Sequence, residues 1–230
     1  MITRTWVTKN YRLVFTRKQP SEERMIQLID DRQMSDFQLD TLREISNIGL
    51  GHAVTSLAEL TNRRIDMSVP RSGFYPFEGI VDLVGGYEEQ IAFVSLKITG
   101  EISGLIMFIF NRESTFNLVD MLMGQESGTS HELNEMGQSA VMEVGNILTG
   151  SFINAIAGMT GLSVATTVPI FAFDMLGAVL SSLLVATGKI EDQVLVIETR
   201  LLQDTLAVKG HFFLLAEHEA IERLFSALAL

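Results

Sequence analysis

The sequence contains no cysteine, and this absence excludes a disulfide framework, a thiolate metal site and a cysteine nucleophile. Basic residues are also few: 17 lysines and arginines stand against 28 aspartates and glutamates, for a net charge of -11. A nucleic-acid-binding surface is therefore not expected, because phosphate contacts need clustered basic side chains. The longest apolar run, residues 175–186, is shorter than the roughly 18 residues that span a bilayer. It predicts a buried helix and no membrane segment.

The composition is that of a folded protein with a sizeable core. The chain has 230 residues, of which 47% are hydrophobic, enough for one large domain or for two small halves that share a core. Residues 1–18 are basic and contain no acidic residue, and they lack the apolar core of a secretory signal. We interpret residues 1–35 as a basic N-terminal extension, either a functional arm or a loosely ordered, dispensable segment. Without an export signal, the expected location is the cytoplasm.

An internal repeat relates the two halves of the chain. The segment "DTLREISN" at 40–47 corresponds to "SAVMEVGN" at 139–146, an offset of 99 positions. Further along, "GLIMFIFNRESTFNLVDML" from Gly104 matches "GHFFLLAEHEAIERLFSAL" from Gly210 at an offset of 106. A short insertion in the second half explains the change of offset. We therefore predict a single domain over residues 36–230, built from repeats at 36–128 and 129–230.

The hydrophobic pattern predicts the same order of elements in both repeats. Each repeat begins with a long helix, over 35–62 and 129–158, with capping-box spacings that start at Ser35 and Thr129. A strand, a short helix, a two-stranded hairpin and a terminal helix follow. The small, polar segment 125–130 is expected to link the repeats. This order predicts an α+β fold in which a mostly antiparallel sheet with pseudo-twofold symmetry is flanked by the two long helices.

Each of the two long helices carries one polar stripe in an otherwise apolar pattern. Residues four and seven positions apart share one face of a helix, so the members of each stripe project together. The stripes are Asp40, Glu44 and Asn47 on the first helix and Ser139, Glu143 and Asn146 on the second. Asparagine is a poor residue for a helix interior and costs up to roughly 0.7 kcal/mol relative to alanine. Its presence at the same register in both repeats favours a functional role over the alternative, an ordinary solvated helix face.

An amide and a carboxylate one turn apart suit one kind of chemistry. The amide is neutral and carries both a donor and an acceptor, so it can orient a water molecule but not deprotonate it. Phosphoryl transfer depends on positioning more than on covalent catalysis, and a glutamine amide positions the attacking water in GTPases. The pattern therefore predicts phosphate hydrolysis on a partner protein that brings its own metal.

The two motifs, together with "NIGLGHA" at 47–53 and "DMLGAVLSSLL" at 174–184, resemble the CheC branch of the CheC/CheX/FliY family of chemotaxis phosphatases. The resemblance covers about residues 36–230. It implies hydrolysis of the aspartyl phosphate of the response regulator CheY, with no cofactor of the chain's own and with magnesium supplied by the regulator. By analogy, Glu44 and Glu143 would pair with the regulator's lysine, Asn47 and Asn146 would align the attacking water, and Asp40 and Ser139 would hold the docked partner.

The resemblance also implies a second partner, the receptor-modifying deamidase CheD, which would dock on the short helix of the second repeat. Asp174 is the expected contact residue there, and the alternative is an ordinary acid at a helix N-terminus. Because the two repeats are fused in one chain, we expect a monomer.

Other candidate sites are weaker. The four histidines are scattered without metal-ligand spacing, so no metal site is expected. Gly49 and Gly51 resemble a fragment of a nucleotide-binding loop, but they lie inside a helical pattern, which favours close helix packing. The alternative function is a non-catalytic module that binds CheY or CheD, like the flagellar switch proteins related to this family.

Overall fold

The computed structural model describes residues 5–8, 11–14, 36–77, 79–187, 193–203, 206–216 and 218–228. The chain divides into two compact units, Met1–Gln33 and Met34–Leu230. In the first unit, β1 (Thr5–Thr8) and β2 (Tyr11–Val14) pair as an antiparallel two-stranded sheet. The other residues of the predicted extension lie outside the described residues.

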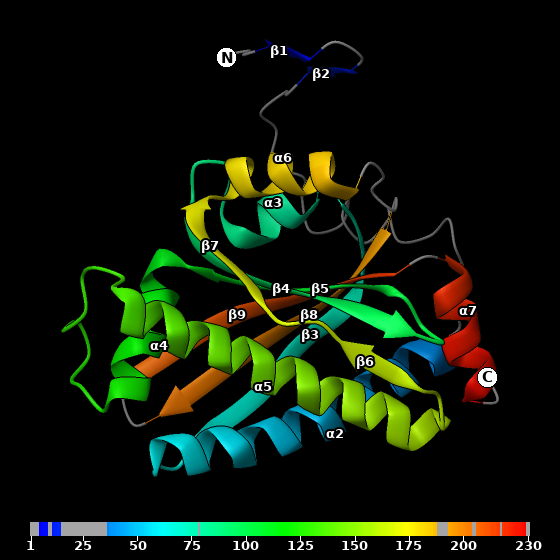
Figure 1. The fold of residues 1–230 in the computed structure, drawn as a ribbon, viewed down its shortest axis with the longest axis horizontal. Helices are drawn as coiled ribbons and strands as arrows, with labels where there is room; N and C mark the ends of the chain where they lie inside the picture. Colours follow the sequence, from blue (N-terminus) through cyan, green and yellow to red (C-terminus); the bar gives the residue numbers. More distant parts are fainter. Residues whose placement is uncertain are drawn as a thin grey trace. The chain divides into compact units, whose positions relative to one another are not determined.

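The second unit is an α+β fold, as the sequence predicts (Figure 1). In chain order its elements are α2 (Asp36–Thr61), β3 (Asp66–Pro76), α3 (Gly79–Val84), β4 (Gln90–Gly100), β5 (Gly104–Asn111), α4 (Arg112–Met123), α5 (Glu135–Thr160), β6 (Val164–Thr166), β7 (Ile170–Met175), α6 (Leu176–Thr187), β8 (Gln193–Gln203), β9 (Leu206–Ala216) and α7 (His218–Ala227). The predicted hairpins, short helices and terminal helices are all present, in the predicted order.

Two strands differ from the prediction. The alternating pattern of residues 64–69 predicts a strand that stops before Pro70, but β3 continues to Pro76, and its pairing register shifts between Ser68 and Arg71. A proline is tolerated here because β3 is an edge strand and the ladder is already interrupted at this point. β7 was not predicted, because its alternation is weak and it directly precedes α6.

All strands of the seven-stranded sheet pair antiparallel, in the order β3-β8-β9-β5-β4-β6, and β7 also pairs with β4. The β4-β5 and β8-β9 hairpins meet along β5 and β9 at the centre. β3 pairs with the hairpin strand β8, and β7 pairs with the hairpin strand β4. Each half of the chain therefore contributes an outer strand to the other half's hairpin, and the strand order reads alike from either edge.

The sheet is covered on both faces (Figure 1). On β4, Ala92 and Val94 pack with α2, α4, α5 and α7, whereas Ile91 and Phe93 pack with α3 and α6. Successive side chains of a strand point to opposite faces, so a strand covered twice is apolar almost throughout. This explains why the hairpin strands are nearly continuous hydrophobic runs rather than alternating ones.

The long helices α2 and α5 pack closely on each other and on the sheet. A methyl group at Gly49 would lie 2.9 Å from the Cα atom of Phe152, and one at Gly145 would lie 2.6 Å from a methyl carbon of Val94. Gly49 therefore serves helix packing, as predicted. By length and composition alone α5 could cross a membrane, but 50% of its most apolar window is buried. Its packing in the core accounts for this apolarity without a bilayer.

The start of α5 differs from the prediction. The helix begins at Glu135 and its N-cap is Asn134, whose side-chain oxygen accepts a hydrogen bond from the Gly137 N–H at 2.8 Å. Thr129, the predicted cap, instead belongs to the linker, where its N–H donates to the buried carboxylate of Asp120 at 3.1 Å. The same carboxylate accepts from the Ser130 N–H at 2.9 Å. These two hydrogen bonds hold the polar linker against α4. The N-cap of α5 therefore lies about one and a half turns after the predicted cap, Thr129. By contrast, α2 begins at Asp36, directly after the predicted cap.

Candidate functional site

The first predicted stripe lies on α2. The side chains of Glu44 and Asn47 are both exposed, whereas Ile45 and Leu50 on the opposite face are buried in the core. Asp40 belongs to the same helix, but its side chain is outside the described residues. The amphipathic pattern therefore places this acid and amide on the solvent side of a helix that is anchored by its other face.

The second stripe lies on α5 and is described completely. Ser139, Glu143 and Asn146 are all exposed, and Val144 and Leu148 are fully buried beneath them. The three side chains share one helix face because they are spaced by four and three residues. The two helices thus present the same Glu-x-x-Asn pair to solvent, and neither amide is enclosed in the core.

We call Glu44 with Asn47, and Glu143 with Asn146, the Glu/Asn ridges. Within the part of the chain that the structure describes, these four side chains make no hydrogen bond or ion pair with another residue. Buried polar groups are normally satisfied inside a protein, and exposed ones are satisfied by water until a ligand replaces it. The ridge groups are therefore available to an incoming molecule without the loss of a hydrogen bond or ion pair to any described residue.

One exposed residue beside the second ridge was missed by the sequence reasoning. Met136 is 67% exposed, although a large apolar side chain gains by burial. It lies three residues before Ser139 and seven before Glu143, so it belongs to the same helix face. The spacing was readable from the sequence, because residue 136 lies inside the helix predicted over 129–158, but nothing in the pattern indicated that this large apolar side chain stays exposed.

Asp174 lies in a different place from the one predicted. It belongs to β7, opposite Ile91 of β4, and not to the short helix that follows. Its side chain is exposed, and one carboxylate oxygen accepts a hydrogen bond from the Met175 N–H at 2.7 Å. The helix itself, α6, starts at Leu176. Asp174 therefore remains at the surface near α6, but it is not on the helix.

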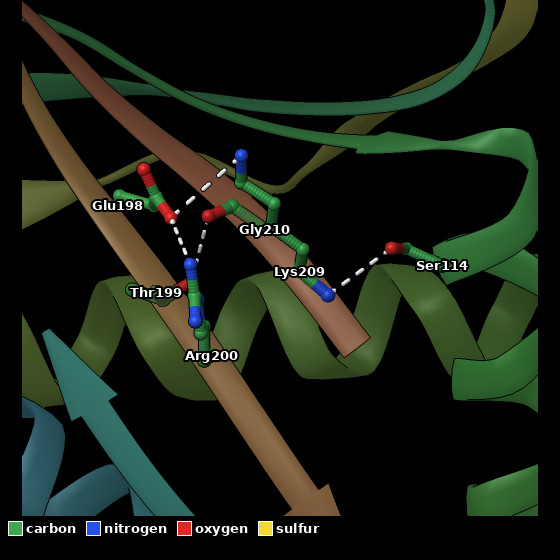
Figure 2. Close-up of polar contacts among 6 residues, drawn as sticks. All are labelled: Ser114, Glu198, Thr199, Arg200, Lys209 and Gly210. Atoms are coloured by element: carbon green, nitrogen blue, oxygen red, sulfur yellow. Dashed lines mark hydrogen bonds and ion pairs between the residues drawn. The ribbon is translucent and has the colours of Figure 1, made fainter. Parts of the chain in front are cut away.

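A second polar group, drawn in Figure 2, lies on β8 and β9. Because side chains alternate along a strand, Glu198 points to the same sheet face as Val194 and Val196, which pack with α3 and α6. Glu198 of β8 is buried, and its carboxylate lies 3.4 Å from the guanidinium of Arg200 and 3.7 Å from the ammonium of Lys209. The Lys209 backbone N–H donates to the hydroxyl of Ser114 at 3.1 Å, which ties β9 to α4. We call Glu198, Arg200, Lys209 and the neighbouring His211 the Glu198 cluster.

His211 is the buried member of this cluster. It pairs directly across the strands with Glu198, and its ring stacks on Phe213 at a centroid distance of 6.0 Å. Burial and the nearby Lys209 charge lower the pKa of His211 to about 4, although Glu198 acts in the opposite direction. The imidazole is therefore neutral at pH 7. Among the described residues, the charged partners of Glu198 are Arg200 on its own strand and Lys209 on the neighbouring strand, so the cluster contributes to the stability of the sheet.

Metal ligands are not grouped in the described part of the chain. No set of three or more histidine or acidic side chains there is arranged to hold an ion. The candidate site thus consists of the two Glu/Asn ridges and the residues beside them.

Comparison with known families and proteins places this geometry in context. Residues 37–73 match the model of the CheC-like family, and residues 92–182 match that of the chemotaxis phosphatase CheX. The CheY-P phosphatase CheC of Bacillus subtilis is 35% identical over 199 residues, which cover 85% of this chain and 95% of that protein. The chain belongs to the CheC family.

Structural relatives of this CheC-family protein share its fold at lower identity. Thermotoga maritima FliY has a TM-score of 0.72 at 20% identity, covering 86% of this chain and 98% of that one. The FliM middle domain from Helicobacter pylori has a TM-score of 0.61 at 8% identity, covering 84% and 99%. At such identities the likeness concerns the fold alone, so the activity has to be argued from the ridges.

Proposed function

We propose that this CheC-family protein is a phosphatase that hydrolyses the aspartyl phosphate of a CheY-type response regulator. The observation that carries the proposal is the pair of Glu/Asn ridges, exposed at the same register on α2 and α5 and without partners among the described residues. A relative named as a CheY-P phosphatase supports the substrate class. The reaction is the replacement of an acyl phosphate bond by a bond to water.

The amides of Asn47 and Asn146 orient the attacking water. The water oxygen forms a bond to phosphorus, the bond between phosphorus and the aspartate oxygen breaks, and the phosphate leaves with the proton that the water gives up. An amide suits this task because it fixes the direction of the water through both a donor and an acceptor, without changing its charge with pH. Magnesium, held by the regulator, offsets the charge that develops on the phosphoryl oxygens.

The carboxylates of Glu44 and Glu143 provide docking. Each pairs with a lysine of the regulator, and Asp40 and Ser139 add polar contacts one turn earlier on the same helix. A carboxylate on an exposed ridge attracts a cationic side chain without a large desolvation cost, so it contributes to both encounter and orientation. The ridge therefore combines a docking group with a water-positioning group one turn away.

We infer that the two sites descend from the two predicted repeats, 36–128 and 129–230. The sheet order supports this: in the path β3-β8-β9-β5-β4-β7, exchanging β3 with β7, β4 with β8 and β5 with β9 gives the same order read from the other edge. The strand exchange between the halves means that neither half has a complete sheet alone. Two sites on one interlocked domain follow from such a duplication.

The alternative is a non-catalytic module that binds the regulator without accelerating hydrolysis. The FliM middle domain shares the fold at 8% identity, so the fold alone does not decide between catalyst and scaffold. The intact Glu and Asn in both ridges favour the catalyst, because a pure docking surface has no need for a repeated helix-disfavouring amide.

CheD is a proposed second partner, at α6. The helix and the residue before it expose three large apolar side chains, Met175 (51%), Leu184 (43%) and Val185 (86%). Exposed apolar side chains gathered on one element are typical of a protein-binding surface. Asp174 lies next to this surface and supplies a charge at its edge. Docking at α6 leaves the ridges free, because they lie on the opposite side of the sheet (Figure 1).

The decisive test is phosphate release from a phosphorylated CheY-type regulator with magnesium present. The proposal predicts that catalytic amounts of the protein accelerate release above the regulator's own rate. Binding of the regulator with an unchanged rate would instead establish the scaffold. Addition of CheD to the same assay distinguishes a regulated catalyst from an independent one.

A further inference from the structure

We propose that Gly51 and Gly150 are positioning residues of the two sites. Because glycine has no side chain, each leaves the helix surface beside the asparagine amide open, so that the regulator can approach the amide closely. The inference rests on the proposed phosphatase function and adds two residues to it. Each glycine lies four residues after the ridge asparagine, at the same register on α2 and on α5. On a helix that spacing places the glycine directly beside the amide, on the same face.

Glycine in the middle of a helix needs a reason, because only proline is a poorer helix former. Two other glycines of the long helices have such a reason inside the chain. A methyl group at Gly49 would meet Phe152 at 2.9 Å, and one at Gly145 would meet Val94 at 2.6 Å. These two positions are kept small by contacts of the fold itself.

Gly51 and Gly150 have no such reason inside the chain. A methyl group at either position would meet no atom of the described residues within 4 Å. Neither has a positive φ, as expected within a regular helix. Both sites could therefore hold alanine at a gain in helix stability. The fold does not require glycine at these two matched positions, so we assign the requirement to the docked regulator.

The partner is the rim of an acidic active site that carries an aspartyl phosphate. To place an amide beside a phosphorus atom of another protein, the helix must enter until its backbone lies near that rim. A side chain one turn from the amide would touch the rim first and hold the amide away. Misplacement of a water-positioning group by about 1 Å costs up to a hundredfold in rate, so a missing side chain here has a catalytic effect.

Gly158 provides a matched control on α5. A methyl group there also meets nothing within 4 Å, but Gly158 lies in the last turn of the helix, twelve residues after Asn146 and turned to another face. The corresponding position of the first repeat is Glu59, so this glycine is not repeated. Gly158 therefore lies outside the proposed site.

The test compares the Gly51→Ala/Gly150→Ala double variant with Gly158→Ala and with the unmodified protein. Each substitution should raise the midpoint of thermal unfolding by about 2–4 °C, since alanine replaces glycine in open space. For hydrolysis of the phosphorylated regulator, kcat/KM should fall about tenfold in the double variant and about a hundredfold when leucine replaces alanine at both positions. Gly158→Ala should retain the unmodified kcat/KM.

Higher stability together with lower activity is a result that a structural role for these glycines would not give. The inference would be overturned if the double alanine variant and the double leucine variant both had the same kcat/KM as Gly158→Ala. It would also be overturned if the Gly51→Ala/Gly150→Ala variant had a lower unfolding midpoint than the unmodified protein. If the unmodified protein does not accelerate hydrolysis, the proposed function fails and this inference with it. If it does and the glycine variants match it, only the glycine inference fails.

Discussion

The Glu/Asn ridges and the Glu198 cluster are both groups of charged and polar side chains, yet they differ in where their partners come from. In the cluster, the buried carboxylate of Glu198 has two cationic partners in the same chain, at 3.4 and 3.7 Å. On the ridges, the described side chains of Glu44, Asn47 and their counterparts on α5 have none. A buried polar group that the fold satisfies stabilises the fold, whereas exposed groups left without a partner at a repeated register are candidates for binding another protein.

The comparison separates two kinds of effect. Substitutions on the ridges should change docking or turnover and leave the free energy of unfolding nearly constant. Substitutions in the cluster should do the reverse, because its members face away from the ridges, on the other face of the sheet. Any residue that changes both quantities strongly would break this separation.

The largest effect is expected from charge reversal on the ridges. Glu44→Lys combined with Glu143→Lys replaces attraction for the regulator's lysine by repulsion at both sites, which should lower kcat/KM about a thousandfold, or about 4 kcal/mol. Steady-state hydrolysis of the phosphorylated regulator measures it. Glu59→Lys reverses one exposed charge later on α2, half the charge change of the ridge variant, and should lower kcat/KM less than the ridge variant by at least a factor of about one hundred.

The next effect concerns pH and His211. The folded protein holds the pKa of His211 at about 4, below the ordinary value of 6.5. Between these values the unfolded chain binds a proton that the folded chain does not, so acidification through this window should lower the free energy of unfolding by up to about 3 kcal/mol. His211→Leu removes this contribution. Urea unfolding at pH 7 and pH 4.5 should show a smaller loss in the variant, and equal losses would contradict the assignment.

Glu198→Gln tests the buried ion pairs. The substitution keeps the size of the side chain but leaves Arg200 and Lys209 without their carboxylate, and we expect a loss of about 2 kcal/mol in the free energy of unfolding. Both cations are partly exposed, at 56% and 46% of their side chains, so water limits the cost. Chemical denaturation measures the loss, and the phosphatase kcat/KM should stay within about twofold. A large fall in kcat/KM would connect the cluster to the site.

The smallest effect compares two asparagines of the same helix. Asn134 caps α5 through the Gly137 N–H at 2.8 Å, so Asn134→Ala should cost about 1 kcal/mol of stability and leave the rate unchanged. Asn146 has no partner among the described residues, so Asn146→Ala should leave stability the same or raise it by up to about 0.7 kcal/mol. Only the second substitution should slow the reaction. Loss of an asparagine amide should therefore lower stability at Asn134, where the amide caps the helix, and lower the reaction rate at Asn146, where it has no partner among the described residues.

The sequence predicted the fold class, the element order and the exposure of the ridges because each depends on local patterns. Helical periodicity put Glu44 and Asn47 on a polar stripe of an otherwise apolar helix, and in the structure both are exposed while their apolar neighbours Ile45 and Leu50 are buried. The family assignment is confirmed as well. The catalytic and docking roles of the ridge residues stay predictions, and so does docking of CheD near Asp174.

What the sequence did not predict depends on contacts between distant segments. The N-cap of α5 was placed at Thr129 because the spacing to Glu132 fits a capping box, but Asp120 binds the Thr129 and Ser130 N–H groups and shifts the start. β7 was missed because it gains its partners from β4, far away in the chain. Gly51 looked like a packing residue beside Gly49, and only the structure shows that one position is crowded and the other open.

The most direct test is the single-turnover rate of phosphate loss from the phosphorylated regulator with the Asn47→Ala/Asn146→Ala variant in saturating excess. Affinity for the same regulator treated with beryllofluoride is measured in parallel. We predict that the rate falls to that of the regulator alone while the affinity stays within about twofold of the unmodified protein. A double variant that hydrolyses the phosphate at the unmodified rate would contradict the assignment of the two amides.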